Sequence, residues 1–214
     1  MEKNMAILMA DLSGYTALTE THGAFAAADI IDRYIAIVEK CLVGDSRVHE
    51  RTGDELMIVS TSPDFLLATA LIMGKNTSNE ENFLLVHGGL HYGKVLERGN
   101  SYFGSAINTT SRIAAKANAG TYWCSEEFME ALSDKSVFTT ISKGNHFFKN
   151  IKKEKEVFEI CNEDRTAFYV DPVCRMLILD PKKAIPHPTE GDQYFCSADC
   201  LEIYITDHQD SEQR

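Results

Sequence analysis

The sequence predicts an α+β fold, a ferredoxin-like sandwich built in the order β-α-β-β-α-β and followed by a small cysteine-containing module. Strand-length apolar runs and helix-length amphipathic runs alternate in this order over the first half of the chain. The character of the chain then changes at Asp171, and three of the six cysteines crowd into residues 174–214. We therefore expect a large domain over residues 1–163 and a module over residues 164–214.

A buried strand and a long amphipathic helix open the predicted fold. Residues 5–12 form a short apolar run that is stopped at Asp11. Ser13 or Thr16 can cap the helix that follows. Over residues 30–41 this helix has apolar side chains at three-and-four spacing, with charged side chains on its other side.

A tight hairpin is the next predicted element. Residues 48–52 and 55–60 have strand character, and the Gly53-Asp54 pair between them is a strong short-range hairpin signal. The expected elements after it are a helix from Pro63 to about residue 73, a polar loop over residues 76–82, a strand over 83–96, a turn over 98–100, a helix from Ser105 to about residue 116, a strand over 121–125, a helix over 126–132 and the last strands within 137–160.

Composition excludes several classes of protein. The formal net charge of -11 argues against a protein that coats nucleic acid, because that task needs basic surface. No apolar run approaches the roughly 20 residues that span a bilayer, and the first residues do not match a signal peptide. We expect a cytoplasmic protein without a nucleic-acid or membrane partner, in which the cysteines are thiols or metal ligands rather than disulfides.

Two aspartates are the first candidate site. A ferredoxin-like sheet brings the end of the first strand, with Asp11, beside the hairpin turn that carries Asp54. Two carboxylates in this arrangement can bridge a pair of hard divalent cations, with substrate phosphates and water completing the coordination. A single aspartate at a strand end is more often a turn former or a helix cap. Whether Asp11 and Asp54 are metal ligands therefore depends on the sequence around them.

Three segments around these positions resemble class III adenylate and guanylate cyclases. They are residues 10–16 (ADLSGYT), residues 53–57 (GDELM) and residues 102–112 (YFGSAINTTSR), which occur in the family's order. The resemblance covers roughly the first three-quarters of the chain. It implies the class III cyclase fold and the conversion of a nucleoside triphosphate, GTP or ATP, into a 3',5'-cyclic nucleotide and pyrophosphate.

The resemblance also implies a set of site residues. Two Mg²⁺ or Mn²⁺ ions would be held by Asp11, Asp54 and the backbone carbonyl of Leu12. Asn108 would orient the ribose, and Arg112, four positions later and so on the same helix face, would stabilise negative charge on the transferred phosphate. In this family one chain holds the metals and another supplies the Asn and Arg, so a head-to-tail homodimer is implied.

Three further positions concern substrate binding. Lys149 resembles the late lysine that reaches the triphosphate in these enzymes, although a lysine in a hairpin is also a common surface residue. Base choice in the family depends on two positions that here hold Glu50 and Ser101, where adenylate cyclases usually have Lys and Asp or Thr. A carboxylate accepts hydrogen bonds from guanine, so this pair favours GTP while leaving ATP and pyrimidine triphosphates open.

The last part of the chain contains a second candidate metal site. Cys174, Cys196 and Cys200 lie in residues 171–176 (DPVCRM) and 194–200 (YFCSADC), which resemble the YHS module, a small domain related to metal-binding cysteine modules. A Cys-x₃-Cys at the start of a helix can direct two thiolates at one cation, and the third cysteine can join them from a knuckle. A buried thiol cluster is the alternative.

The sequence does not specify which metal this module would bind or which residue would be its fourth ligand. Zn²⁺, copper and ferrous iron all suit thiolates, and the sequence offers His187, Asp199 or His208 without marking any of them by spacing. His87 and His91, four apart in a predicted strand, favour a structural role. A rival to an active cyclase is a catalytically weak or inactive nucleotide-binding protein of this fold that acts as a metal- or redox-responsive regulator.

Overall fold

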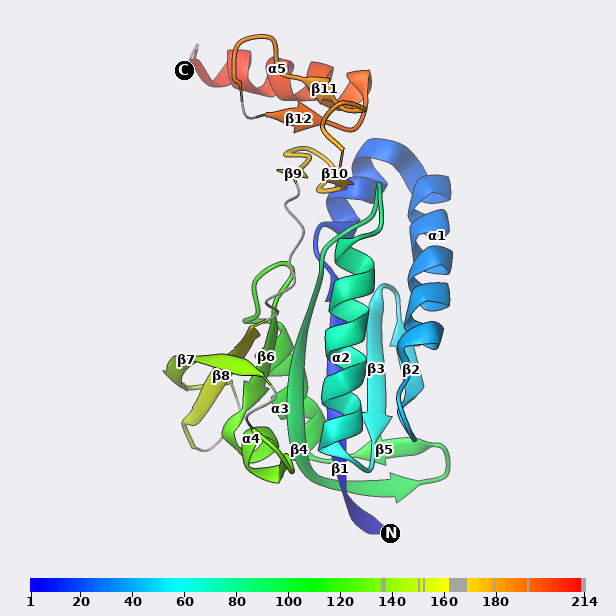
Figure 1. Ribbon diagram of the computed structural model, residues 1–214, viewed down its shortest axis with the longest axis vertical. Coiled ribbons are helices and arrows are strands. Elements are labelled where there is room, and N and C mark those ends of the chain that lie inside the picture. The colour runs from blue at the N-terminus through cyan, green and yellow to red at the C-terminus, as the bar shows by residue number, and fades with distance from the viewer. Residues whose placement is uncertain are drawn as a thin grey trace.

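An eight-stranded sheet forms the centre of the protein in the computed structural model, which describes residues 1–135, 138–149, 151, 153–161, 169–178, 180–191 and 193–212 (Figure 1). The strand order is β2-β3-β1-β4-β6-β8-β7, and β5 pairs with β4. The elements of this domain are β1 (Glu2–Leu12), α1 (Tyr15–Cys41), β2 (Arg47–Thr52), β3 (Glu55–Ser60), α2 (Pro63–Ser78), β4 (Val86–Arg98), β5 (Ser101–Phe103), α3 (Ser105–Ala114), β6 (Tyr122–Ser125), α4 (Glu126–Ala131), β7 (Thr139–His146) and β8 (Lys155–Cys161).

The order of the first four strands confirms the ferredoxin-like prediction. Strand β1 is antiparallel to both β3 and β4, and β2 closes the edge through its hairpin with β3. The α+β class is therefore confirmed, and the crossover helices α1 and α2 lie on the same side of the sheet in Figure 1. This order places the ends of β1 and of the β2–β3 hairpin next to each other.

Strand β1 is buried on both faces because helices cover each of them. Its alternate side chains divide between two cores, since successive strand residues point to opposite faces. Leu8 and Ala10 belong to the core under α1 and α2, whereas Ile7 and Met9 belong to the core that contains Ala106 of α3. This double burial explains why residues 5–10 form an unbroken apolar run.

Helix boundaries differ from those expected from periodicity. Helix α1 begins at Tyr15 with Gly14 at its N-cap position, so the caps expected from Ser13 or Thr16 are wrong, and the helix is broken at Gly23, whose φ of 79° and ψ of 174° are not helical. Helix α2 continues to Ser78 into the expected polar loop, and α3 ends at Ala114. The bend in α1 is visible in Figure 1 and turns the first part of the helix across the end of the sheet.

The C-terminal residues form a separate small unit. It comprises β9 (Tyr169–Val170), β10 (Leu177–Ile178), β11 (Ile185–Pro186), β12 (Tyr194–Phe195) and α5 (Ala198–Glu212), and its core contains Cys174, Phe195 and Cys200. The expected boundary between residues 163 and 164 lies outside the described residues. No helix in the described part of the chain has the length and apolar character needed to cross a bilayer.

This unit, which we call the cysteine module, packs on the sheet domain next to the bend of α1 (Figure 1). The amide of Leu177 donates to the carbonyl of Phe83 at 2.6 Å, and the amide of Asn82 donates to the carbonyl of Leu177 at 3.2 Å. Met176 forms an isolated bridge with Leu84. The module is thereby joined to the segment that leads into β4.

Gly89 of β4 allows α3 to approach the sheet closely. A Cβ atom there would lie 2.3 Å from the backbone nitrogen of Ala114 and 2.7 Å from the carbonyl oxygen of Thr110. We expect Gly89→Ala to push α3 away and lower the free energy of unfolding by more than about 2 kcal/mol, as overpacking does. Urea unfolding followed by the fluorescence of Trp123, the single tryptophan, measures the change.

Gly99→Ala is the matched control for that variant. Gly99 has open space around it and a φ of 61°, so an alanine there meets only backbone strain of about 1 kcal/mol. Equal losses in the two variants would contradict the close helix-to-sheet contact as the reason for Gly89.

Candidate active site

Two carboxylates lie side by side where β1 ends. Asp11 is in register with His87 of β4, and Asp54 occupies the turn between β2 and β3, directly before the strand that pairs with β1. Alternation along β1 puts Asp11 on the same face as Met9, the face that α3 covers. The Oδ1 atom of Asp11 is buried and has no hydrogen-bond partner among the described residues.

Burial raises the pKa values of both carboxyls, and the charge of Asp11 adds to the rise at Asp54. Burial, followed by the charge of Asp11, raises the pKa of Asp54 to about 6. Burial also raises the pKa of Asp11, and the pKa of the adjacent Glu55 is raised by burial and by Asp54. Crowded carboxylates that carry an unsatisfied oxygen suit a hard divalent cation, because the cation supplies the missing positive charge.

The loop after Asp11 is held in place by the start of β4. The amide of Ser13 donates to the carbonyl of Leu85 at 2.8 Å, and Ser13 Oγ is hydrogen-bonded to His87 Nδ1 at 2.9 Å. Leu12, whose carbonyl is a predicted metal ligand, lies in β1 with its side chain buried. His87 therefore supports the loop, in agreement with the structural role expected from the sequence.

Asn108 and Arg112 occupy the exposed side of α3. Both side chains are exposed, whereas the sheet-facing side of the helix is buried. The buried residues are Ala106, Thr109, Thr110, Ile113 and Ala114. The described structure thus places Asn108 and Arg112 on the exposed side of α3, away from the sheet.

Glu50 lines a small hollow of about 160 Å³ between β2, β3 and the start of α3. Its walls also include Met9, Met57 and Tyr102. Ser101, the other predicted base-selecting position, is exposed and precedes Tyr102 in β5. The hollow is therefore lined by two carboxylates, Glu50 and Glu55, beside apolar side chains, and Ser101 is not one of its lining residues.

Lys149 is exposed in the turn that follows β7. The neighbouring Phe147 is 76% exposed, and the β7 strand has few buried residues. The structure does not bring Lys149 to the carboxylate pair within one chain; it lies on the far edge of the sheet, which ends in β7.

Comparison with known proteins identifies the family. The model of the adenylate and guanylate cyclase catalytic domain matches residues 1–162. The chain belongs to this family. The cyclase domain of this chain therefore spans all the predicted catalytic positions, from Asp11 to Lys149.

Relatives of the cyclase domain come from several bacteria. An uncharacterised protein of Mycobacterium tuberculosis (strain H37Rv) is 32% identical over 126 residues, 58% of this chain and 33% of that protein. A pH-sensitive adenylate cyclase of M. tuberculosis (strain CDC 1551) is 26% identical over 132 residues, 62% of this chain and 33% of that protein. The chain thus spans about a third of the length of these curated relatives.

Solved structures share the fold. An adenylate cyclase from Trypanosoma brucei superposes with a TM-score of 0.70 at 15% identity, covering 77% of this chain and 92% of that one. A guanylate cyclase domain from Catenaria anguillulae, in complex with GTP, gives a TM-score of 0.60 at 18% identity, with 75% and 98% covered. At these identities the likeness establishes the cyclase fold alone.

The cysteine module adds a cluster of four potential ligands next to the cyclase domain. The Sγ atoms of Cys174 and Cys196 lie 3.5 Å apart, and those of Cys196 and Cys200 lie 3.7 Å apart. His22 of α1 completes the cluster, with its Nε2 atom 3.5 Å from Cys200 Sγ and 3.7 Å from Cys196 Sγ. All six cysteines are free thiols.

Sequence reasoning missed His22. It lies 174 positions before Cys196, in another domain, so no local spacing could indicate it. The residues considered instead have other surroundings: His187 Nδ1 accepts from the amide of Glu190, and His208 stacks on Tyr204. The side chain of Asp199 is exposed.

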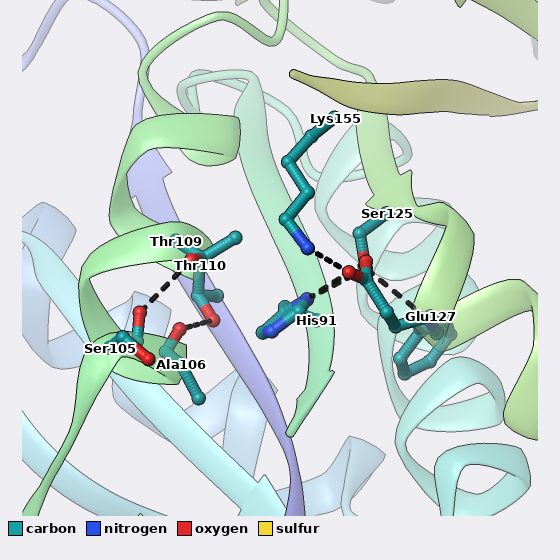
Figure 2. Close-up of polar contacts among 9 residues, drawn as sticks. His91, Ser105, Ala106, Thr109, Thr110, Ser125, Glu127 and Lys155 are labelled. Carbon is teal, nitrogen blue, oxygen red and sulfur yellow. Dashed lines mark hydrogen bonds and ion pairs between the residues drawn. The ribbon is translucent and has the colours of Figure 1, made fainter. Parts of the chain in front are cut away.

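A second cavity of the cyclase domain, about 590 Å³, lies beside α3 (Figure 2). His91, Glu127 and Lys155 line it, and both basic side chains point toward the Glu127 carboxylate in Figure 2. His91 Nδ1 is 2.7 Å from Ser125 Oγ and 3.8 Å from Glu127 Oε2, and Lys155 pairs with Glu127. The hydrogen bond and burial of His91 support a structural role.

The buried His91 gives the cyclase domain a pH-dependent stability. Burial, helped by Lys155, lowers the pKa of His91 from 6.5 to about 4. Since the folded state favours the neutral ring, its contribution is complete above pH 6.5 and is lost as the pH falls toward 4. We expect a loss of about 2 kcal/mol between pH 7.5 and pH 5 that is absent in His91→Gln.

Urea unfolding at the two pH values measures this contribution. The exposed His208 is the control position, and His208→Gln should keep the full pH dependence of the native chain. An unchanged pH dependence in His91→Gln would show that another group is responsible.

Proposed function

We propose that the chain is an active nucleotidyl cyclase, which converts a nucleoside triphosphate into a 3',5'-cyclic nucleotide and pyrophosphate at the interface of a head-to-tail homodimer. One observation carries the proposal: in a chain of the cyclase family, Asp11 and Asp54 lie side by side with raised pKa values and an unsatisfied buried oxygen. A pair in that state favours divalent cations and the phosphates that accompany them.

The reaction exchanges one phosphorus–oxygen bond for another. The ribose 3'-oxygen bonds to the α-phosphorus, the bond from that phosphorus to the bridging oxygen breaks, and the 3'-hydroxyl proton passes to solvent. Asp11, Asp54 and the Leu12 carbonyl would hold two Mg²⁺ or Mn²⁺ ions. When bound, such ions make the 3'-hydroxyl more acidic and neutralise the triphosphate.

The partner chain would contribute Asn108, Arg112 and Lys149. Asn108 would hold the ribose so that its 3'-oxygen faces the phosphorus, and Arg112 would stabilise the charge that develops on the phosphoryl oxygens. Support for a partner comes from large apolar side chains on the same segments: Phe103 is 52% exposed and Phe147 is 76% exposed. Covering them in a dimer would remove apolar surface from water.

Base choice is proposed to favour guanine, with adenine as the alternative. The Glu50 carboxylate accepts hydrogen bonds from the guanine N1–H and amino group, and the hollow beside it has methionine walls suited to a flat ring. Several relatives are named adenylate cyclases, which is the observation in favour of ATP.

A second candidate function is a weak or inactive cyclase that acts as a metal- or redox-responsive regulator. The observation in its favour is the contact between the module and the site loop: a Cβ atom on Gly14 would lie 2.5 Å from the side chain of Arg175. Nucleotide binding without turnover would support this candidate over the first.

Identification of products tests the proposed function directly. The purified chain is incubated with each of four nucleoside triphosphates and Mn²⁺ or Mg²⁺, and products are identified by mass spectrometry. We expect a cyclic purine nucleotide together with pyrophosphate, in greater yield from GTP. Absence of a cyclic product from all four, with nucleotide binding intact, would overturn the proposal.

Mixed dimers test the shared site. Asp11→Ala and Arg112→Ala should each abolish activity, because each removes one side of every site. When the two inactive chains are mixed, half of the dimers should regain one site of two, so that about a quarter of the native activity returns. Asp11→Ala mixed with Asp54→Ala is the control and should stay inactive, and recovery there would contradict the arrangement.

Exchange of the base-selecting residues tests the role of the hollow. Glu50→Lys with Ser101→Asp introduces the pair usual in adenylate cyclases. We expect the ratio of kcat/KM for ATP to that for GTP to rise on the order of 10- to 100-fold. An unchanged ratio, with activity retained, would place base recognition elsewhere.

A further inference from the structure

The four ligand atoms of the cluster formed by His22, Cys174, Cys196 and Cys200 are arranged for one cation. All of them lie within 4.8 Å of one another, and four of the distances between them are 3.5 to 3.7 Å. A tetrahedral zinc with Zn–S near 2.3 Å and Zn–N near 2.0–2.1 Å has ligand–ligand edges of about 3.6–3.8 Å. The cluster therefore already has the size of a tetrahedral shell.

A disulfide does not account for this arrangement. The shortest sulfur contact, 3.5 Å between Cys174 and Cys196, is far longer than an S–S bond of about 2.05 Å. A purely apolar thiol core does not account for it either, because the His22 ring is directed at two of the sulfurs.

The backbone around the cysteines is fixed by a buried carboxylate. Asp171 is fully buried, and its Oδ1 accepts from the amides of Val173 and Cys174 at 2.8 and 3.1 Å. Its Oδ2 accepts from the amide of Cys196 at 2.7 Å. One side chain thus connects the two loops that carry the thiols, as carboxylates that orient the ligands do in metal sites.

Cys200, the third cysteine, is positioned by the first turn of α5. The amide of Cys200 donates to Ser197 Oγ at 3.2 Å in the first turn of α5. Cys174 and Cys200 are fully buried, and Cys196 is half-buried. The backbone of all three cysteines is therefore held by hydrogen bonds, and the thiols of Cys174 and Cys200 are shielded from solvent.

His22 reaches the cluster because α1 is broken directly after it. Gly23 has a non-helical φ of 79°, and the short first part of α1 turns toward the module. Gly14 holds the N-cap position of that part of the helix, and Arg175, the residue after Cys174, packs against Gly14. The cluster thus joins the module to the helix that follows the Asp11 loop.

We propose that His22, Cys174, Cys196 and Cys200 bind one Zn²⁺ ion, which fastens the cysteine module to the first part of α1. Three thiolates and one imidazole in a closed tetrahedron form a structural zinc site, with no position left for substrate. The ion connects two domains, so its binding stabilises the interface between them. The site stands independently of whether the cyclase domain turns over nucleotides.

Metal content and affinity test the ligand set. The full chain is purified, its metals are measured by mass spectrometry, and the metal-free form is titrated with Zn²⁺ against a chromophoric chelator. We expect one zinc per chain. His22→Ala should weaken zinc binding by about 100-fold or more, because loss of a direct ligand exceeds the roughly 10- to 100-fold loss seen when a residue that only hydrogen-bonds to a ligand is removed.

Matched variants make the test specific. Cys200→Ser should weaken zinc as strongly as His22→Ala, whereas His208→Ala removes a module histidine outside the cluster and should bind zinc like the native chain. Native affinity in His22→Ala would overturn the proposal. Copper or iron in place of zinc in the purified chain would overturn the assignment of the metal.

Hydrogen exchange tests whether the ion joins the two domains. Adding Zn²⁺ to the metal-free native chain should slow exchange both around Cys174 and Cys196 and in the first part of α1. In His22→Ala, saturating zinc should protect only the cysteine loops. Equal protection of α1 in native and variant chains would show that the ion does not fasten the module to the helix.

Discussion

Two like charges held next to each other are the constraint on which the rest of this site depends. The strand order puts β1 between β3 and β4, so that Asp11 and the turn bearing Asp54 are neighbours. Burial then raises the pKa values of both carboxyls. Keeping both carboxyls ionised in this position lowers the stability of the folded state. A divalent cation bound between them would offset that loss.

The loop after Asp11 connects this pair to the cysteine module. Ser13 is fixed by Leu85 and His87 at the start of β4, while Gly14 lies against Arg175 of the module. The module in turn forms backbone hydrogen bonds to the segment just before β4. Ser13 and Gly14 therefore contact both the start of β4 and the module, so the position of the module bears on the loop after Asp11.

Local signals predicted the sheet and the carboxylate pair. The apolar run before Asp11 and the Gly53-Asp54 turn are signals carried by a few consecutive residues. The ferredoxin-like strand order follows from the order of helices and strands along the chain. Glu50 and Ser101 could be singled out only through the family resemblance, and of the two Glu50 lines the hollow beside β2 and β3. The family motifs added Asn108 and Arg112, whose exposed positions on α3 agree with contribution to a partner chain.

Features that join distant segments could not be predicted. His22 meets the cysteines only because α1 breaks at Gly23, and its own neighbours in the sequence show no sign of a ligand. The start of α1 was expected near Ser13 or Thr16, but Gly14 holds the N-cap position, and the break at Gly23 has no signal in the apolar spacing. Packing of the module on Gly14 likewise depends on tertiary contact, which periodicity does not encode.

Direct measurement of Mn²⁺ binding tests the central claim, that Asp11 and Asp54 form a divalent-metal site. Electron paramagnetic resonance counts bound Mn²⁺ in the presence of a triphosphate analogue that cannot cyclise. We expect about two ions per chain in the native protein and a clear loss in Asp54→Asn and Asp11→Asn. Native binding in the double variant would contradict it.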